Sequence, residues 1–255
     1  MPSIEYVVPN GITVAAMVLG LGSIFASTTG DFELAGWMIV WAMLLDKLDG
    51  AAARMLQATS KFGAELDSFS DFVSFGIAPA ALVRFGLGAM PFWEESMGWL
   101  LSATAGAYVV AAALRLAKFN ITTYPAGSTH FFGVPTTAVA GIIAGFFVCL
   151  GRHDATREAL VFMPLLLLVC IILMLGRFPM PKLGRRSNRW VQGLQIVLVV
   201  SAYAVAPFRL FPEYLLSVVL ILVGAGLVAG MIHPPQETSS DFPSDGLAEM
   251  EQIHL

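Results

Sequence analysis

The chain has 255 residues, of which 57% are hydrophobic and 13% charged, and its mean hydropathy is +0.76. A soluble domain usually carries about 25% charged residues, so this composition excludes an ordinary soluble protein and indicates an integral membrane protein. The net charge of −4 is concentrated in a tail, because the last twenty residues contain five acids and no Lys or Arg. We expect residues 1–232 to form one membrane-embedded domain and residues 233–255 an acidic, disordered cytoplasmic tail. The first residues lack the basic region of a signal peptide, so we expect them to be retained.

Eight apolar segments alternate with breaks such as Gly30-Asp31 and Pro125. A helix needs about 20 apolar residues to cross the hydrocarbon of a bilayer. Candidate transmembrane helices lie at residues 11–29, 33–54, 66–88, 98–118, 134–151, 160–176, 191–207 and 213–232. The sequence therefore predicts an all-α polytopic bundle of about eight transmembrane helices.

Basic residues are divided unevenly between the two sides of this bundle. If the N-terminus is cytoplasmic, ten of the 14 Lys and Arg residues lie on the cytoplasmic side and four on the other. Loops on the cytoplasmic side of membrane proteins carry the excess of Lys and Arg. We therefore expect an integral protein of the cytoplasmic membrane with both termini in the cytoplasm.

Four carboxylates interrupt the second and third apolar segments. Asp46 and Asp49 are three residues apart, and Asp67 and Asp71 are four apart, so each pair projects from one side of its helix. The short connection makes the two helices antiparallel neighbours whose acids can face one another. A charged residue inside a bilayer costs at least about 3 kcal/mol and usually marks a functional site. We expect the active site at the cytoplasmic ends of these two helices.

Carboxylates without nearby His or Cys favour hard divalent cations, Mg²⁺, Mn²⁺ or Ca²⁺, and the expected cofactors are two ions of Mg²⁺ or Mn²⁺. Two such ions about 4 Å apart stabilise the attacking and leaving oxygens of an in-line displacement at phosphorus. Gly50, one turn beyond Asp46, would let a bulky ligand approach the backbone. Arg54, a further turn along, can bind a phosphate through two hydrogen bonds. Ser60 can donate its hydroxyl to a phosphate oxygen, and Gly63 leaves the next helix face low.

Residues Asp46 to Asp71 match every fixed position of the pattern D-x2-D-G-x2-A-R-x8-G-x3-D-x3-D. The chain therefore resembles the CDP-alcohol phosphotransferases, which carry this signature. The resemblance implies that the four aspartates hold two metal ions and that Asp71 is also the general base. It further implies that CDP-diacylglycerol is bound by Pro9, Asn10, Thr13, Gly50, Arg54, Ser60 and Gly63. Without the family, the segment from Pro9 to Thr13 is only a helix start, with Asn10 or Thr13 as its cap.

Further segments are similar to the phosphatidylserine synthase branch of that family: residues 61–68 with 74–79, residues 113–120 and residues 131–135. The resemblance extends over roughly residues 5–190 and implies serine as the acceptor and a homodimer. Two departures concern the acceptor, because Lys118 stands where Arg is expected and Thr136-Thr137 replaces Ser-Pro. Arg115, Lys118 and Asn120 would bind the serine carboxylate. The alternative for these residues is an ordinary cationic anchor at the cytoplasmic surface.

The resulting hypothesis is transfer of the phosphatidyl group from CDP-diacylglycerol to the hydroxyl of L-serine, giving phosphatidylserine and CMP. Another acceptor, glycerol 3-phosphate or inositol 1-phosphate, would use the same chemistry but more cationic groups than Arg115 and Lys118 supply. A cation- or proton-coupled transporter also keeps carboxylates in the membrane. Transporters often contain inverted repeats and helices broken at the midplane, and the sequence shows no such repeat. Nothing in the sequence indicates a nucleic-acid partner.

Overall fold

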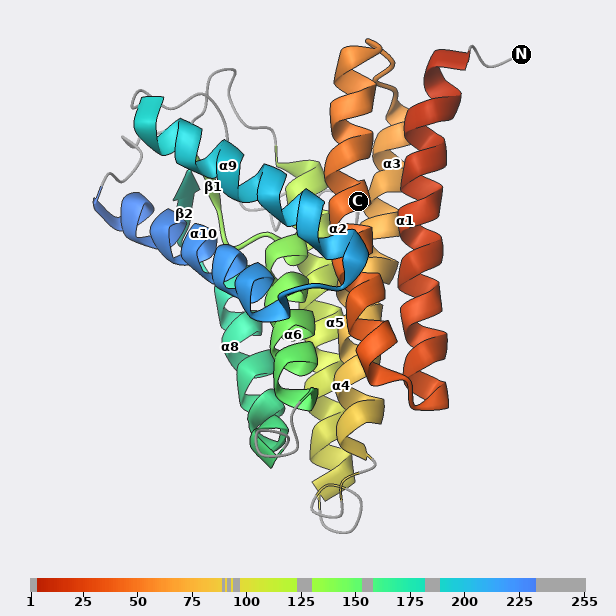
Figure 1. Ribbon diagram of the computed structural model, residues 1–255, viewed down its shortest axis with the longest axis vertical. Helices are drawn as coiled ribbons and strands as arrows, with labels where there is room; N and C mark the ends of the chain where they lie inside the picture. Colours follow the sequence, from red (N-terminus) through yellow and green to blue (C-terminus); the bar gives the residue numbers. More distant parts are fainter. Residues whose placement is uncertain are drawn as a thin grey trace, which may run out of the picture.

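The computed structural model describes residues 4–88, 90, 93, 97–122, 130–152, 158–181 and 189–232, and most of them are helical (Figure 1). The helices are α1 (Ile4–Thr29), α2 (Phe32–Met55), α3 (Lys61–Asp71), α4 (Ala78–Gly88), α5 (Gly98–Ile121), α6 (Thr136–Gly151), α8 (Met163–Leu175), α9 (Arg189–Val205) and α10 (Pro212–Ile232). A π-helical segment, Phe72–Ile77, joins α3 to α4, and 3₁₀ turns lie at Glu158–Phe162 and Ala206–Phe208. The predicted tail, residues 233–255, lies outside the described residues.

Each of the eight predicted apolar segments coincides with helical structure. Among the described residues, five helical stretches are long and apolar enough to cross a membrane: Glu5–Thr29, Lys61–Gly88, Gly98–Ile121, Glu158–Leu175 and Pro212–Ile232. Two further apolar helices, Thr136–Gly151 and Ile196–Phe208, are shorter than such a span requires. The remaining helix, α2, has 24 residues but carries charges at both ends, including Asp46 and Asp49. The helical class is thus confirmed, whereas the count of eight spans stays a prediction.

The helix start predicted at Pro9 to Thr13 is wrong. α1 begins at Ile4 and Pro9 lies inside it, so neither Asn10 nor Thr13 caps it. Proline removes one backbone hydrogen bond, yet α1 continues through Pro9. α3 begins at Lys61, ahead of the third predicted membrane segment, and Ser60 caps it by accepting a hydrogen bond from the Gly63 N–H at 3.0 Å.

The break predicted at Gly30-Asp31 is confirmed as a tight helical hairpin. Gly30 follows α1 with φ +88°, a left-handed conformation that glycine adopts without steric cost. Asp31 then caps α2, its carboxylate accepting from the Leu34 N–H at 3.1 Å. The Ser23 hydroxyl donates to the carbonyl of Ala35 at 2.8 Å, which holds the two helices together inside the core.

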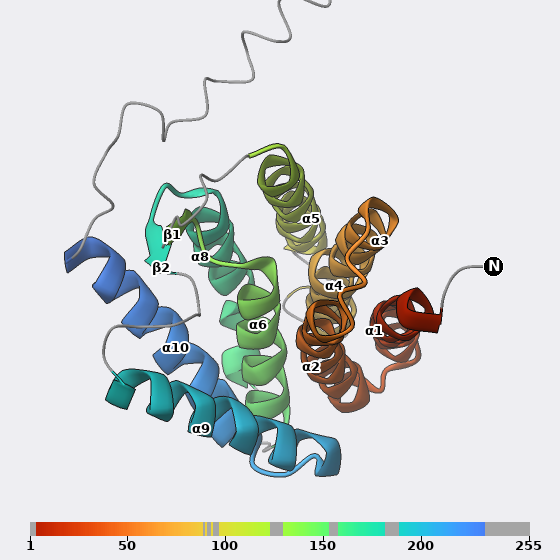
Figure 2. The same cartoon turned by 90° about the horizontal axis from the view of Figure 1, so that it is seen from above.

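The helices form a bundle with two parts, α1 to α5 on one side and α6 with α8, α9 and α10 on the other, as the view from above shows (Figure 2). α1, α2, α4 and α5 run side by side along the long axis, and α6 and α8 continue the bundle beside them. α9 and α10 cross this bundle obliquely, with α10 packed on α6. The core between these helices contains fully buried Trp37, Leu82, Tyr108 and Ile143.

Two three-residue strands add a feature that an all-α prediction misses. β1 (His130–Phe132) pairs antiparallel with β2 (Pro179–Pro181), with Phe131 opposite Met180. Gly133, at φ +80°, follows β1 and donates its N–H to the carbonyl of Phe178 at 2.9 Å. The ribbon therefore ties the start of α6 to the end of α8, and α10 packs against β2.

The close packing of α4 on α6 predicts the effect of one added methyl group. A Cβ at Gly86 would overlap the ring of buried Phe147, whereas a Cβ at Gly224 on α10 would meet open space. We expect Gly86→Ala to destabilise the fold by about 1–3 kcal/mol, as overpacking usually does. Gly224→Ala, the control, should leave stability unchanged or slightly raised because alanine favours helix. Thermal unfolding in detergent measures both, and equal midpoints would contradict this packing.

Candidate active site

A large cavity of about 1010 Å³ lies among α2, α3, α5, α6, α9 and α10. All four predicted aspartates line it, together with Gly50, Arg54 and Arg115. Beyond these polar groups the lining is mostly apolar and belongs to α2, α6, α9 and α10. One end of the cavity is therefore suited to a charged group and the rest to an apolar one.

The aspartates come together as their spacing predicts. Oxygens of Asp46, Asp49 and Asp67 all lie within 4.8 Å of one another, although they come from two different helices. Asp49 is buried, with 5% of its surface exposed, and the other two are partly buried. Asp71 lies one turn beyond Asp67 on α3 and lines the same cavity. Three carboxylates at this separation repel one another strongly unless cations offset their charge.

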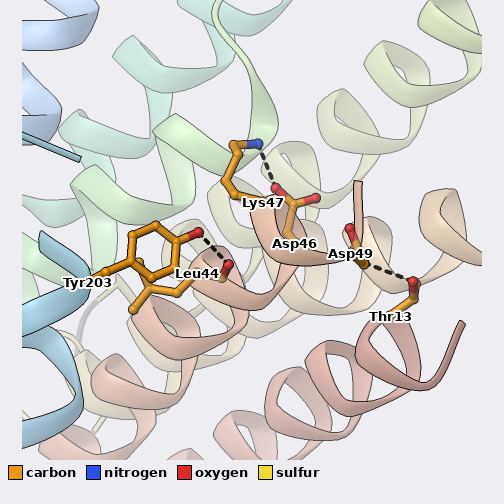
Figure 3. A network of polar contacts seen from close by, with 6 residues as sticks. All are labelled: Thr13, Leu44, Asp46, Lys47, Asp49 and Tyr203. Atoms are coloured by element: carbon orange, nitrogen blue, oxygen red, sulfur yellow. Dashed lines mark hydrogen bonds and ion pairs between the residues drawn. The ribbon is translucent and has the colours of Figure 1, made fainter. Parts of the chain in front are cut away.

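Lys47 supplies one such cation. Its ammonium lies 2.6 Å from Asp46 Oδ2 and also lines the cavity (Figure 3). The Lys47 side chain is 57% exposed, so the ion pair is screened by solvent and contributes at most about 1 kcal/mol to stability. Sequence reasoning counted Lys47 only among the cytoplasmic basic residues, although its place between Asp46 and Asp49 was a signal for a role in the site.

Thr13 links the two helices that carry the aspartates. Its hydroxyl donates to Asp49 Oδ2 at 2.8 Å and lies 3.1 Å from the carbonyl oxygen of Pro9 (Figure 3). The backbone carbonyl of the same residue accepts a hydrogen bond from the Ser70 hydroxyl of α3 at 3.1 Å. α1 therefore orients one carboxylate of α2 and fixes the helix of the opposite pair.

The remaining predicted nucleotide-binding residues form two groups. A Cβ at Gly50 would lie 3.3 Å from Arg54 Nη1, so the guanidinium folds back over that glycine. A Cβ at Gly63 would lie 3.2 Å from both Asn10 Oδ1 and Ser60 Oγ. The side chains of Asn10 and Ser60 therefore both lie next to Gly63 at the start of α3. Ser60 is thus also a helix cap, and its hydroxyl proton remains available to an acceptor.

The predicted acceptor residues at the end of α5 do not all meet at the cavity. Arg115 lines it, whereas Lys118 and Asn120 are exposed and do not appear in its lining. The Asn120 side-chain amide donates to the Ser68 hydroxyl at 2.9 Å, which joins the end of α5 to α3. Lys118 and Asn120 lie on the last turn of α5, and the helix borders the cavity at Arg115, Leu116 and Phe119.

Two aromatic side chains attach the α9 wall of the cavity to α2. The Tyr203 hydroxyl donates to the carbonyl of Leu44 at 2.7 Å (Figure 3), and Trp41 Nε1 donates to the carbonyl of Ala206 at 2.9 Å. The Arg209 guanidinium lies over the Trp41 ring, 5.1 Å from its centroid. Sequence reasoning did not find Tyr203, because nothing local connects it with residues about 160 positions earlier.

The chemistry of these groups fits a divalent cation. The three clustered ligands offer only carboxylate oxygens, which Mg²⁺ and Mn²⁺ prefer. Their oxygens converge from two helices held by side-chain hydrogen bonds, as metal ligands usually are. Asp71, on the same face of α3 as Asp67, completes a set of four.

Comparison with known proteins identifies the family. The CDP-alcohol phosphatidyltransferase family profile matches residues 6–175, more than half of the chain. The chain therefore belongs to this family, and the matched residues include all four aspartates of the cavity.

Three relatives, each named CDP-diacylglycerol–serine O-phosphatidyltransferase, illustrate the similarity. A Helicobacter pylori protein is 38% identical over 138 residues, 54% of this chain and 56% of its own length. A Mycobacterium leprae protein is 32% identical over 233 residues, 89% of this chain and 75% of its own length. A Bacillus subtilis protein is 40% identical over 115 residues, 45% of this chain and 61% of its own length. The chain thus aligns with little more than half of the Helicobacter relative.

The contact between Thr13 and Asp49 predicts that α1 influences metal binding. We expect Asp49→Asn to weaken Mn²⁺ binding strongly, and Thr13→Val to weaken it by about 10-fold or more, because groups that orient ligands typically contribute that much. Mn²⁺ titration of the purified protein, followed by electron paramagnetic resonance, measures both. The control is Asp31→Asn at the opposite end of α2, where asparagine still caps the helix. Wild-type affinity in Asp49→Asn would remove that residue from the site.

Proposed function

We propose that the protein transfers the phosphatidyl group of CDP-diacylglycerol to the hydroxyl of L-serine and releases CMP. The observation that carries this proposal is the cavity itself, which joins a cluster of carboxylates to a long apolar lining. A CDP-lipid has the same division between a charged diphosphate and two hydrocarbon tails. The names of the similar proteins support serine as the acceptor.

Asp46, Asp49, Asp67 and Asp71 would hold two divalent cations, Mg²⁺ or Mn²⁺, which neutralise phosphate charge and stabilise the departing CMP when bound. Gly50 and Arg54 would contact the diphosphate, Arg54 through its two parallel N–H groups. Asn10, Ser60 and Gly63 would form the nucleotide side of the site, next to Pro9 and Thr13. The clustering of Asn10, Ser60 and Gly63 at the start of α3 supports this assignment.

Asp71 would act as the general base. The serine hydroxyl attacks the phosphorus that bears the diacylglycerol, and its proton passes to the Asp71 carboxylate. The bond from that phosphorus to the bridging oxygen breaks, and the bridging oxygen leaves with CMP. A positioned base of this kind contributes about 10²–10⁴-fold to the rate.

Arg115 would bind the serine carboxylate, because it is the acceptor residue of α5 that lines the cavity. Lys118 and Asn120 would act at the rim, where Asn120 already holds the end of α5 to α3. The exposed cation of Lys118 would attract the carboxylate of serine from the cytoplasm.

We further infer the placement of the protein in the membrane. Residues 1–232 would form one domain of eight membrane helices in the cytoplasmic membrane, with the tail, residues 233–255, and both termini in the cytoplasm. The start of α1 lies at the same end of the bundle as the end of α2 and the start of α3, which supports a cytoplasmic site (Figure 1). The homodimer implied by the family resemblance stays a prediction.

The first test of the proposed function is CMP release by the purified protein in detergent. CDP-diacylglycerol and Mn²⁺ or Mg²⁺ are supplied with serine, glycerol 3-phosphate, inositol 1-phosphate or inositol, one acceptor at a time. We expect release with serine alone and its loss in EDTA. CMP release with a different acceptor would support the reaction class and overturn the assignment of serine as the acceptor.

The role of Asp71 predicts a variant that folds but does not turn over. Asp71→Asn keeps the size of the side chain but cannot take the proton, so kcat should fall by about 10²–10⁴-fold. CMP release measures kcat, and thermal unfolding checks the fold. Turnover close to that of wild type would remove the base assignment.

The place of Arg115 predicts a selective effect on the acceptor. We expect Arg115→Gln to raise KM for serine by at least about 10-fold, because one charge-assisted hydrogen bond contributes about 1.5–3 kcal/mol, while KM for the lipid changes less. The control is Arg84→Gln on α4, whose guanidinium donates to the Ser102 hydroxyl far from the cavity. An unchanged KM for serine would refute the role of Arg115.

A further inference from the structure

The helix that carries Asp67 and Asp71 changes its winding directly after Asp71. Residues Phe72–Ile77 are π-helical, and α4 resumes the α-helix at Ala78. The Ala78 N–H bonds the carbonyl of Val73, five residues earlier, as in a π-helix. π-helical turns are rare and occur mostly at functional sites. The catalytic and binding roles proposed for the aspartates do not explain why this segment is π-helical.

Pro79 removes a backbone donor that a continuous α-helix would use in this segment. In an α-helix the carbonyl of Phe75 would accept from the N–H of residue 79, which proline lacks. Phe75 is buried, with 1% of its surface exposed, so water does not replace that donor. A buried carbonyl without a donor is costly, and proteins normally supply one.

Tyr108 donates to the Phe75 carbonyl from another helix. Its side chain comes from the middle of α5, is fully buried, and donates its hydroxyl proton to the carbonyl of Phe75 at 2.8 Å. Gly76, the next residue, packs against α5 as well: a Cβ there would lie 3.3 Å from the Cβ of Ala112. The π-helical segment is therefore held against α5 by one hydrogen bond and a close contact.

The opposite side of the segment is held by α1. The Ser70 hydroxyl donates to the carbonyl of Thr13 at 3.1 Å, and the Ser74 hydroxyl donates to the carbonyl of Ala16 at 3.0 Å. Gly20 of α1 has no room for a Cβ, because Ser74 occupies that space. These contacts fix the residues on both sides of Asp71.

The extra residue in a π turn changes the direction of the aspartates relative to α4. One residue corresponds to about 100° of rotation in an α-helix. α4 is fixed by its buried face, which includes Leu82 and Val83 at 0% exposure. Without the π turn, Asp67 and Asp71 would rotate by about that angle away from Asp46 and Asp49 while α4 kept its place.

We propose that Tyr108 is a positioning residue for the aspartate site, because its hydroxyl holds the π-helical segment that turns Asp67 and Asp71 toward α2. Pro79 is the second part of this arrangement, since it removes the competing α-helical bond. The predicted effect of Tyr108 on turnover rests on the proposed function. Its predicted effect on metal binding does not depend on which substrates the protein uses.

The experiment compares Tyr108→Phe with Thr104→Val in the full-length protein in detergent. Thr104 lies one turn earlier on α5, and its hydroxyl bonds only to the carbonyls of Leu100 and Leu101 on its own helix. Mn²⁺ titration by electron paramagnetic resonance gives both affinity and stoichiometry. We expect Tyr108→Phe to weaken Mn²⁺ binding by about 10- to 100-fold, the usual effect of losing a group that orients ligands, and Thr104→Val to leave it unchanged.

The two titration parameters separate positioning from simple loss of fold. Reduced affinity at full stoichiometry supports the proposal. Unchanged affinity, or fewer binding-competent molecules that each keep wild-type affinity, overturns it. A wild-type protein that does not bind Mn²⁺ would overturn it as well.

Pro79→Ala provides a second variant that does not depend on the folding of Tyr108→Phe. Alanine restores the backbone N–H that proline lacks, which could then bond the carbonyl of Phe75, and it favours continuous α-helix. We expect thermal stability at least equal to that of wild type but Mn²⁺ binding weakened by about 10-fold or more. Wild-type Mn²⁺ affinity in this variant would overturn the proposal.

The same samples separate this inference from the proposed function. If wild type binds Mn²⁺ and releases no CMP with serine, the proposed function fails while the comparison of Tyr108→Phe with wild type remains valid. If wild type is active and Tyr108→Phe keeps both its Mn²⁺ affinity and its kcat, the proposed function stands and the positioning role is overturned.

Discussion

Repulsion between carboxylates is the constraint on which the rest of this structure depends. Asp46, Asp49 and Asp67 bring their oxygens within 4.8 Å of one another in an apolar bundle, which is unfavourable without compensating cations. A loop could relax by moving its acids apart. Here the acids are on helices packed on several sides, so the scaffold maintains a high density of negative charge. Such a density of negative charge would favour small, strongly charged cations.

Thr13 shows how the scaffold withstands that repulsion. One residue of α1 donates through its hydroxyl to Asp49 on α2 and accepts through its carbonyl from Ser70 on α3. α1 therefore contacts both helices that carry the acids and helps to fix their separation. On the far side of the π-helical segment, Tyr108 of α5 has the corresponding function for α3 and α4.

The features that could be predicted from the sequence are those encoded by local spacing. The two aspartate pairs predicted facing helices, and Gly30-Asp31 predicted the hairpin, because helix geometry and capping depend on neighbouring residues. The partners of Tyr108 and Tyr203 could not be predicted, since packing joins them to residues 33 and 159 positions away. Nor could the ribbon of β1 and β2, whose short strands have no pattern of their own.

The family profile covers only one of the two parts of the chain that line the cavity. The charged end is formed by helices inside residues 6–175, whereas much of the apolar wall belongs to α9 and α10, beyond residue 175. Substitutions on these two helices can change the shape of the apolar wall without touching a carboxylate. The apolar wall and the carboxylate cluster are therefore free to change separately in evolution, and an exchange of the last two helices between relatives would alter the wall and leave the carboxylates in place.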